Sequence, residues 1–202
     1  MSNLHVHLID DDQRILTALS RLLSSAGYVV EAYADAESFL AGHRPDLPGC
    51  AVVDLSLPGK DGFAVQTALE ACGRPVVFLS GQADIPASVR AMKAGALDFL
   101  VKPVDADTLL AAVGHAVEVD QARRQSLRDR RAFEQRLSRL TPRERQVLEH
   151  VVAGRLNKQI AGDLGTVEKT IKVHRGRMME KMGVRTVADL VRMVEQFRPD
   201  RQ

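Results

Sequence analysis

The architecture of this chain is best inferred from the segment Ala51-Val52-Val53-Asp54-Leu55-Ser56-Leu57-Pro58-Gly59. Its apolar and β-branched residues predict a buried strand that ends at Asp54, and the Pro-Gly pair behind it predicts a turn. Asp54 is therefore expected to carry a carboxylate at the C-terminal end of a buried strand. In open parallel α/β sheets, ligands bind beyond these ends of the strands. The segment thus predicts both a sheet and a site.

Three other strand-like segments also run into polar groups. Residues 4–9 are followed by Asp10, Asp11 and Asp12, residues 76–79 by Ser80-Gly81, and residues 99–101 by Lys102-Pro103. Since the carboxyl ends of parallel strands meet at one edge of a sheet, carboxylates, a hydroxyl group and a lysine should converge there. Such a set of side chains can accept a phosphoryl group.

Strand and helix signals alternate up to about residue 118. The expected strands cover residues 4–9, 29–33, 51–54, 76–79 and 99–101, and amphipathic helical spacing follows each of them. Five β/α units with short connections predict an α/β doubly wound five-stranded parallel sheet with helices on both faces, a flavodoxin-like arrangement. We assign residues 1–118 to this domain.

Residues 119–138 are rich in Arg and Gln and contain no Gly or Pro. This composition favours a helix that continues the fifth helix of the sheet domain, and a disordered tether is the alternative. We treat this segment as a helical linker between two domains.

Residues 139–202 are expected to form an all-α domain of four short helices. Thr141-Pro142-Arg143-Glu144 is a capping box with proline at the first helical position, and Asn157 is expected to cap the second helix. A tight turn containing Gly165 separates that helix from the next, at residues 168–182. Two short helices joined in this way predict a helix-turn-helix motif.

Charge is distributed unevenly between the two halves. Residues 1–120 contain 8 Lys and Arg against 16 Asp and Glu, a net charge of −8, and residues 121–202 contain 20 against 10, a net charge of +10. A basic half favours binding to a polyanion. Cys50 and Cys72 show no metal-binding spacing, and neither a secretory signal nor a membrane-spanning segment is evident. We expect a cytoplasmic protein without a membrane partner.

The predicted edge of the sheet suits phosphoryl chemistry. A carboxylate such as Asp54 can attack phosphorus and form an acyl phosphate. Asp10, Asp11 and Asp54 offer hard oxygen ligands for Mg²⁺, which would offset the repulsion between carboxylate and phosphate. Lys102 offers a positive charge, and Ser80 a hydrogen bond, for the phosphoryl oxygens.

These motifs give the chain a family resemblance. Asp10-Asp11, Asp54 with Pro58-Gly59, Ser80-Gly81 and Lys102-Pro103 make the first half similar to the receiver domain of two-component response regulators. The second half resembles the LuxR-type DNA-binding domain in three segments, at residues 140–144, 157–161 and 170–175. The whole chain therefore resembles the NarL/FixJ family.

The resemblance implies a role for each residue of the site. Asp54 is the expected phosphoacceptor, and Asp10, Asp11, Asp54 and the backbone carbonyl of Ser56 are the expected Mg²⁺ ligands. Phosphate binding and switching are expected of Ser80, Gly81, Lys102 and Phe99, with a cis bond before Pro103. Ser56 and Gln82 occupy the positions that influence the lifetime of the phosphate. The implied partners are a sensor histidine kinase and, on phosphorylation, a second copy of the chain.

The helix at residues 168–182 is the candidate recognition helix for promoter half-sites in double-stranded DNA. Ile171, Met178 and Met182 share one stripe that should face the domain core. The residues expected to contact DNA are Lys158, Lys169, Lys172, Val173, Arg175, Gly176 and Arg177. Two residues depart from the family pattern, because Gly176 replaces a larger side chain and Val167 replaces the usual serine cap.

The expected function is a response regulator that is phosphorylated on Asp54, dimerises and regulates transcription, with RNA polymerase as a further candidate partner. It is not expected to be an enzyme beyond Mg²⁺-dependent phosphoryl transfer to its own Asp54. A phosphatase with an Asp nucleophile is one alternative, but Ser56 stands where such enzymes carry a second Asp. A DNA-binding protein that does not depend on phosphate is another. His5 and His7 share a strand face, where core histidines are expected rather than metal ligands.

Overall fold

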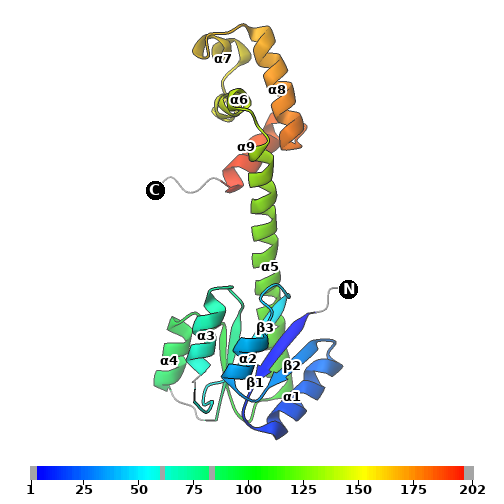
Figure 1. The fold of residues 1–202 in the computed structure, drawn as a ribbon, viewed down its shortest axis with the longest axis vertical. Helices are drawn as coiled ribbons and strands as arrows, with labels where there is room; N and C mark the ends of the chain where they lie inside the picture. The colour runs from blue at the N-terminus through cyan, green and yellow to red at the C-terminus, as the bar shows by residue number, and fades with distance from the viewer. Residues whose placement is uncertain (1–3, 60–61, 82–84, 198–202) are drawn as a thin grey trace. The chain divides into compact units, whose positions relative to one another are not determined.

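The computed structural model describes residues 4–59, 62–81 and 85–197 (Figure 1). Its contacts divide the chain into two compact units, Met1–Arg124 and Gln125–Gln202. None of the helices in the described residues is long and apolar enough to cross a membrane.

The first unit is a five-stranded parallel sheet. The strands are β1 (His5–Ile9), β2 (Val29–Tyr33), β3 (Gly49–Asp54), β4 (Val76–Ser80) and β5 (Asp98–Val101), in the order β2-β1-β3-β4-β5. The helices between them are α1 (Gln13–Ser25), α2 (Ala36–Gly42), α3 (Gly62–Glu70) and α4 (Ile85–Lys93), and α5 (Ala106–Ser138) follows β5. The predicted doubly wound sheet is confirmed.

The two faces of the sheet carry separate apolar cores. On one face Leu8 and Val52 pack with residues of α1 and α5, among them Leu23 and Val113. On the other face Val53 and Phe78 pack with α2, α3 and α4, where the buried residues include Phe39, Val65, Leu69 and Ala91. Burial on both faces explains why β3 and β4 are nearly continuous apolar runs rather than alternating ones.

The register of the sheet brings the polar strand ends together. Ile9 pairs with Val53, so Asp10 and Asp54 occupy adjacent positions where β1 and β3 end. Asp54 pairs with Leu79 on the next strand, directly before Ser80. Ser80 in turn pairs with Val101, which precedes Lys102. The predicted convergence at one edge of the sheet therefore follows from three parallel pairings.

At the N-terminal ends of the strands, a polar network that the sequence did not reveal holds the sheet domain together. Asp120 of α5 is fully buried, and its Oδ2 accepts a hydrogen bond from the backbone N of Gly49 at 2.9 Å. Gly49 has φ +147°, and a Cβ there would lie 1.8 Å from the carbonyl oxygen of His5. Arg124 donates to Asp120 at 2.6 Å and to the carbonyl oxygens of residues 45–47. These contacts fix the loop before β3 to α5.

Residues 106–138 form one helix, as predicted for the linker. Its first half contributes Leu109, Val113 and Val117 to the core of the sheet unit. Its last turns contribute Phe133 and Leu137 to the core of the second unit. The helix α5 is therefore a structural part of each unit.

The second unit continues with four helices: α6 (Pro142–Val152), α7 (Asn157–Asp163), α8 (Glu168–Met182) and α9 (Val187–Phe197). The capping box of α6 is present, with Thr141 and Glu144 each accepting from the other's backbone N. Ile171, Met178 and Met182 of α8 are fully buried, so the predicted core stripe is confirmed.

One predicted helix start was wrong. Asn157 does not cap α7, because it is the first residue of the helix and Leu156 takes the cap position without a side-chain hydrogen bond. The side chain of Gln159 accepts from the backbone N of Leu156 instead. The Oδ1 of Asn157 is occupied by Nη1 of Arg175 at 2.9 Å. A contact with α8 has thus replaced the local cap.

Candidate functional site

Three carboxylates gather beyond the ends of β1 and β3. One oxygen from each of Asp10, Asp11 and Asp54 lies within 4.8 Å of the others. Asp10 and Asp54 are only 2% and 5% exposed, whereas Asp11 is exposed. Such proximity of buried carboxylates is unfavourable unless cations neutralise them.

Lys102 provides one such cation. Its Nζ donates to Oδ2 of Asp10 at 2.6 Å and to Oδ2 of Asp54 at 3.0 Å. Burial alone would lower the pKa of Lys102, but the hydrogen bonds with the two carboxylates raise it above its usual value. The ammonium group is thus held charged between the carboxylates. The backbone N of Lys102 donates to the carbonyl oxygen of Ser80 at 2.7 Å. The Lys102-Pro103 bond is cis, as predicted.

Backbone amides orient the two buried carboxylates. Oδ1 of Asp10 accepts from the backbone N of Asp12 at 2.9 Å, and Oδ1 of Asp54 accepts from that of Ser56 at 3.1 Å. Each buried carboxylate therefore directs one oxygen to its own loop and the other to Lys102. Asp12, the third of the consecutive aspartates, lies outside the cluster of three carboxylates and caps α1. The hydrogen bond from Arg14 lowers the pKa of Asp12 to about 2.

The donor set of this cluster fits Mg²⁺. Three carboxylates offer oxygen ligands alone, and one of them is open to solvent, which suits an ion that keeps several water ligands. The surplus of negative charge also fits, because one lysine faces two buried carboxylates.

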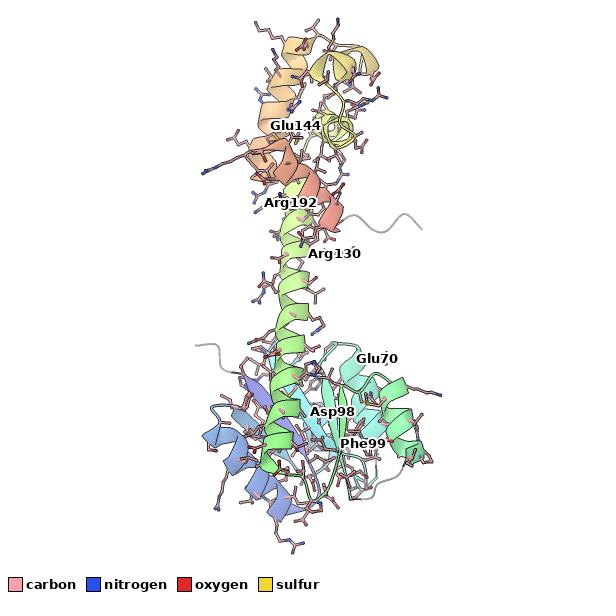
Figure 2. All side chains as sticks on the ribbon, turned by 180° about the vertical axis from the view of Figure 1, so that it is seen from behind. Glu70, Asp98, Phe99, Arg130, Glu144 and Arg192 are labelled. Carbon is pink, nitrogen blue, oxygen red and sulfur yellow. The ribbon has the colours of Figure 1, made fainter. Side chains whose placement is uncertain are left out.

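The remaining site residues lie at the ends of β4 and β5. Ser80 is buried as the last residue of β4, and a Cβ at Gly81 would meet no atom within 4 Å, so the backbone there can be approached closely. Phe99 lies half-buried on β5 next to Asp98, against the core formed with α2, α3 and α4 (Figure 2). Gln82 lies outside the described residues.

The helix α8 presents a basic face to solvent. Lys169, Lys172, Val173 and Arg177 are exposed, and a Cβ at Gly176 would meet no atom within 4 Å. Val167 holds the cap position of α8 without a side-chain hydrogen bond, so the usual serine cap is absent. Lys158 is exposed near the start of α7. Side chains on this face can contact both base edges and phosphates.

Two side chains of α8 have partners inside the protein that the sequence did not suggest. Arg175 donates to Asn157 of α7 and so has part of its donor set occupied. Lys181, in the last turn, donates to the buried Glu144 of α6 at 2.6 Å. The spacing of residues along the sequence could not have indicated either pair, because the partners lie on separate helices. Both contacts fix α8 to its neighbours.

The histidines of β1 lie in the core, as expected. His7 is fully buried and His5 nearly so, and each lies close to Glu31 of β2, with Nδ1 at 3.5 and 3.1 Å from its carboxylate. Burial, followed by the charge of Arg74, lowers the pKa of His7 to about 4. Cys50 and Cys72 are free, and burial raises the pKa of the Cys50 thiol to about 12.

Family models match both halves of the chain. Residues 6–114 match the response regulator receiver domain, and residues 138–194 match the bacterial regulatory proteins of the luxR family. The first match covers the acidic cluster and Lys102, and the second covers the helix-turn-helix.

Two relatives align with nearly the whole length of this chain. Nodulation protein W of Bradyrhizobium diazoefficiens is 41% identical over 192 residues, covering 94% of this chain and 85% of that protein. The transcriptional regulatory protein FixJ of Azorhizobium caulinodans is 40% identical over 195 residues, covering 95% and 92%.

Two solved structures are also similar to this chain over nearly its whole length. The response regulator StyR superposes with a TM-score of 0.89 at 44% identity, over 96% of this chain and 99% of that one. Full-length FixJ from B. japonicum gives 0.58 at 35% identity, over 98% of both chains. With its receiver domain and LuxR-type DNA-binding domain, this chain belongs to the NarL/FixJ family of two-component response regulators that control transcription.

Proposed function

We propose that a sensor histidine kinase phosphorylates Asp54, and that phosphorylation promotes a homodimer which binds promoter half-sites. The observation that carries this proposal is the pair of contacts from Lys102 Nζ to Asp10 and Asp54 at the sheet edge. A lysine held between two buried carboxylates lies where an incoming phosphoryl group needs a positive charge. Of the three carboxylates, Asp54 is the one at the end of the central strand β3.

Each residue of the cluster has one task in this transfer. A carboxylate oxygen of Asp54 attacks phosphorus as the bond to the kinase's histidine breaks, which leaves an acyl phosphate on Asp54. Asp10, Asp11, Asp54 and the backbone carbonyl of Ser56 hold Mg²⁺, which neutralises charge on the carboxylates and the phosphoryl oxygens. Lys102 exchanges part of its contact with Asp54 for a phosphoryl oxygen, and Ser80 donates a hydrogen bond to another. Gly81 leaves room for the group.

The proposed signal passes from Ser80 to Phe99, which lies half-buried on the neighbouring strand and can move further inward.

The second unit then binds DNA through α8. Lys169, Lys172, Val173 and Gly176 face the bases, whereas Lys158, Arg177 and the free part of Arg175 contact phosphates. Two chains in one dimer meet two half-sites, which raises affinity through effective concentration. RNA polymerase is a further proposed partner, and the proposed location is the cytoplasm.

The phosphatase alternative is disfavoured by the residue at position 56. A phosphatase of this type needs a second acid two residues after its nucleophile, and Ser56 is exposed there with its backbone N on Asp54. Because a serine cannot supply that acid function, the acyl phosphate is proposed to be a signal rather than a turnover intermediate.

The proposal is tested by the intact mass after incubation with acetyl phosphate and Mg²⁺. One phosphoryl adduct is expected on the wild-type chain, and none on Asp54→Asn or in EDTA. Asp12→Asn is the matched control, because Asp12 caps α1 and should leave the adduct unchanged. An equal adduct on Asp54→Asn would contradict the assignment of the phosphoacceptor.

A further inference from the structure

The C-terminal end of α8 is held by backbone geometry and by one arginine of α5. Gly183 adopts φ +68°, and the backbone N atoms of Gly183 and Val184 bond back to the carbonyl oxygens of Glu180 and Met179. The carbonyl oxygen of Met182 lies beyond this motif and needs another donor. Nη1 of Arg136 donates to it at 3.2 Å.

This arginine comes from the last turn of α5, 46 residues earlier in the chain. A guanidinium at the C-terminal end of a helix also meets the negative end of the helix dipole. A Cβ at Gly183 would lie 3.6 Å from Cζ of Arg136, an ordinary van der Waals distance, so the guanidinium lies directly beside this end of α8.

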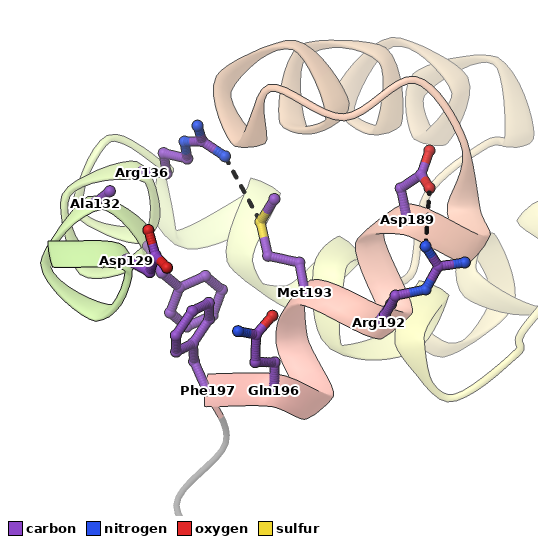
Figure 3. A pocket seen from close by; sticks show the side chains of 9 residues that line it. Asp129, Ala132, Arg136, Asp189, Arg192, Met193, Gln196 and Phe197 are labelled. Carbon is purple, nitrogen blue, oxygen red and sulfur yellow. Dashed lines mark hydrogen bonds and ion pairs between the residues drawn. The ribbon is translucent and has the colours of Figure 1, made fainter. Parts of the chain in front are cut away.

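The same turns of α5 pack against α9. The rings of Phe133 and Phe197 stack with centroids 5.1 Å apart, and Nη1 of Arg136 lies 3.8 Å from Sδ of Met193 (Figure 3). Beside these contacts is a pocket of about 300 Å³ between α5 and α9. Arg136 is half-buried and lines this pocket, and its Nη1 is held by the hydrogen bond to Met182 together with the contact to Met193.

We propose that Arg136 is a positioning residue for DNA reading, and that the last turns of α5 belong to the DNA-binding unit. This inference rests on the proposed role of α8 as the recognition helix. Arg136 and Lys181 hold the C-terminal end of α8 against α5 and α6, and Arg175 holds its middle against α7. A helix fixed to its neighbours at its middle and at its C-terminal end presents its exposed face at one angle. Base contacts depend on that angle, whereas non-specific phosphate contacts tolerate changes in it.

The test uses the full chain with Arg136→Ala, Arg136→Lys and Arg131→Ala. Arg131 is an exposed arginine of the same helix, so its removal changes the charge equally. Arg136→Ala is expected to weaken binding to a selected site between about threefold and tenfold and to leave scrambled DNA nearly unaffected. Arg136→Lys should recover most of the loss, because it keeps a cation and a donor at the helix end. Arg131→Ala should not change the ratio of specific to non-specific affinity.

Hydrogen exchange provides a measurement that does not involve DNA. In Arg136→Ala, the amides at the end of α8 should exchange faster than in the wild type and in Arg131→Ala, with those of α6 unchanged. Equal exchange and equal affinity ratios in the two alanine variants would overturn the proposal. So would a loss of about one unit in the salt slope, because Arg136 would then contact phosphate itself. If the wild type bound no DNA, the proposed function would fail, while exchange would still report on the helix end.

Discussion

At the scale of single residues, Lys102 has a structural role in addition to its proposed chemical one. Its charge is already in use in the unphosphorylated state, where it bridges Asp10 and Asp54. Removal of one partner from a buried ion pair leaves the other charge uncompensated. The sequence indicated a role for this charge toward the phosphoryl oxygens, and the two contacts add a role in the unphosphorylated chain.

Lys102→Ala is therefore expected to lower the free energy of unfolding by about 1–3 kcal/mol in the absence of Mg²⁺. Mg²⁺ should restore part of this loss by neutralising the same carboxylates. Urea unfolding with and without the ion measures both effects. The variant should also fail to dimerise with beryllofluoride in sedimentation. Lys93→Ala, at an exposed position on α4, is the control; similar curves for the two variants would contradict the role of Lys102.

His7 makes the stability of the first unit depend on pH. Burial, followed by the charge of Arg74, lowers the pKa of His7 from 6.5 to about 4 in the folded chain, so folding favours its neutral form. This contribution is fully present above pH 6.5 and is lost as the pH falls toward 4. A shift of this size corresponds to roughly 3 kcal/mol, of which about 2 kcal/mol is lost by pH 5.

His7→Leu should therefore show a smaller decrease in unfolding free energy between pH 7 and pH 5 than the wild type. Urea unfolding at the two pH values measures this difference. His115→Gln changes an exposed histidine of α5 and should behave like the wild type. An unchanged pH dependence in His7→Leu would show that another group is responsible.

At the scale of elements, α5 stabilises the first unit through Asp120. Asp120→Ala is expected to cost about 2–4 kcal/mol of unfolding free energy, because it leaves the Gly49 N–H and the guanidinium of Arg124 without their buried acceptor. Thermal or urea unfolding of the full chain measures the effect. Glu118→Ala, at an exposed position on the same helix, should change little. A loss of the same size in both variants would argue against the buried contact.

Helices and strands could be predicted where local sequence determines them. Apolar runs with polar ends predicted four of the five strands, the alternation of strand and helix signals predicted β2, and the Thr141-Glu144 capping box predicted the start of α6. The contacts of Asp120 and Arg136 could not be predicted from the sequence. Asp120 accepts from the backbone N of Gly49, 71 residues away, and Arg136 donates to the carbonyl oxygen of Met182, 46 residues away. Nearly every residue has the same backbone N–H and C=O groups, so the sequence does not indicate which of them a side chain will contact. Asn157 was misassigned because a distant partner, Arg175, competed with the local cap.

At the scale of the whole molecule, the basic half is expected to read DNA through two kinds of contact. Lys172→Ala should cost about 1–3 kcal/mol on the best site and relax the preference at one base pair of each half-site. Arg177→Ala should weaken all sequences alike and lower the salt slope by about one unit. Binding to a selected site and to scrambled DNA across a salt series separates the two. The opposite pattern would mean that α8 enters the groove in another orientation.

The sharing of α5 between the two units limits how this chain can be recombined with its relatives. A junction after residue 118 would separate Asp120 and Arg124 from the loop they hold, and a junction before residue 139 would separate Phe133 and Arg136 from α8 and α9. A crossover within residues 125–132 keeps both sets of contacts. Hybrid regulators joined there should retain the stability of both parents, whereas those joined at the apparent ends of the sheet domain or the helix-turn-helix should not.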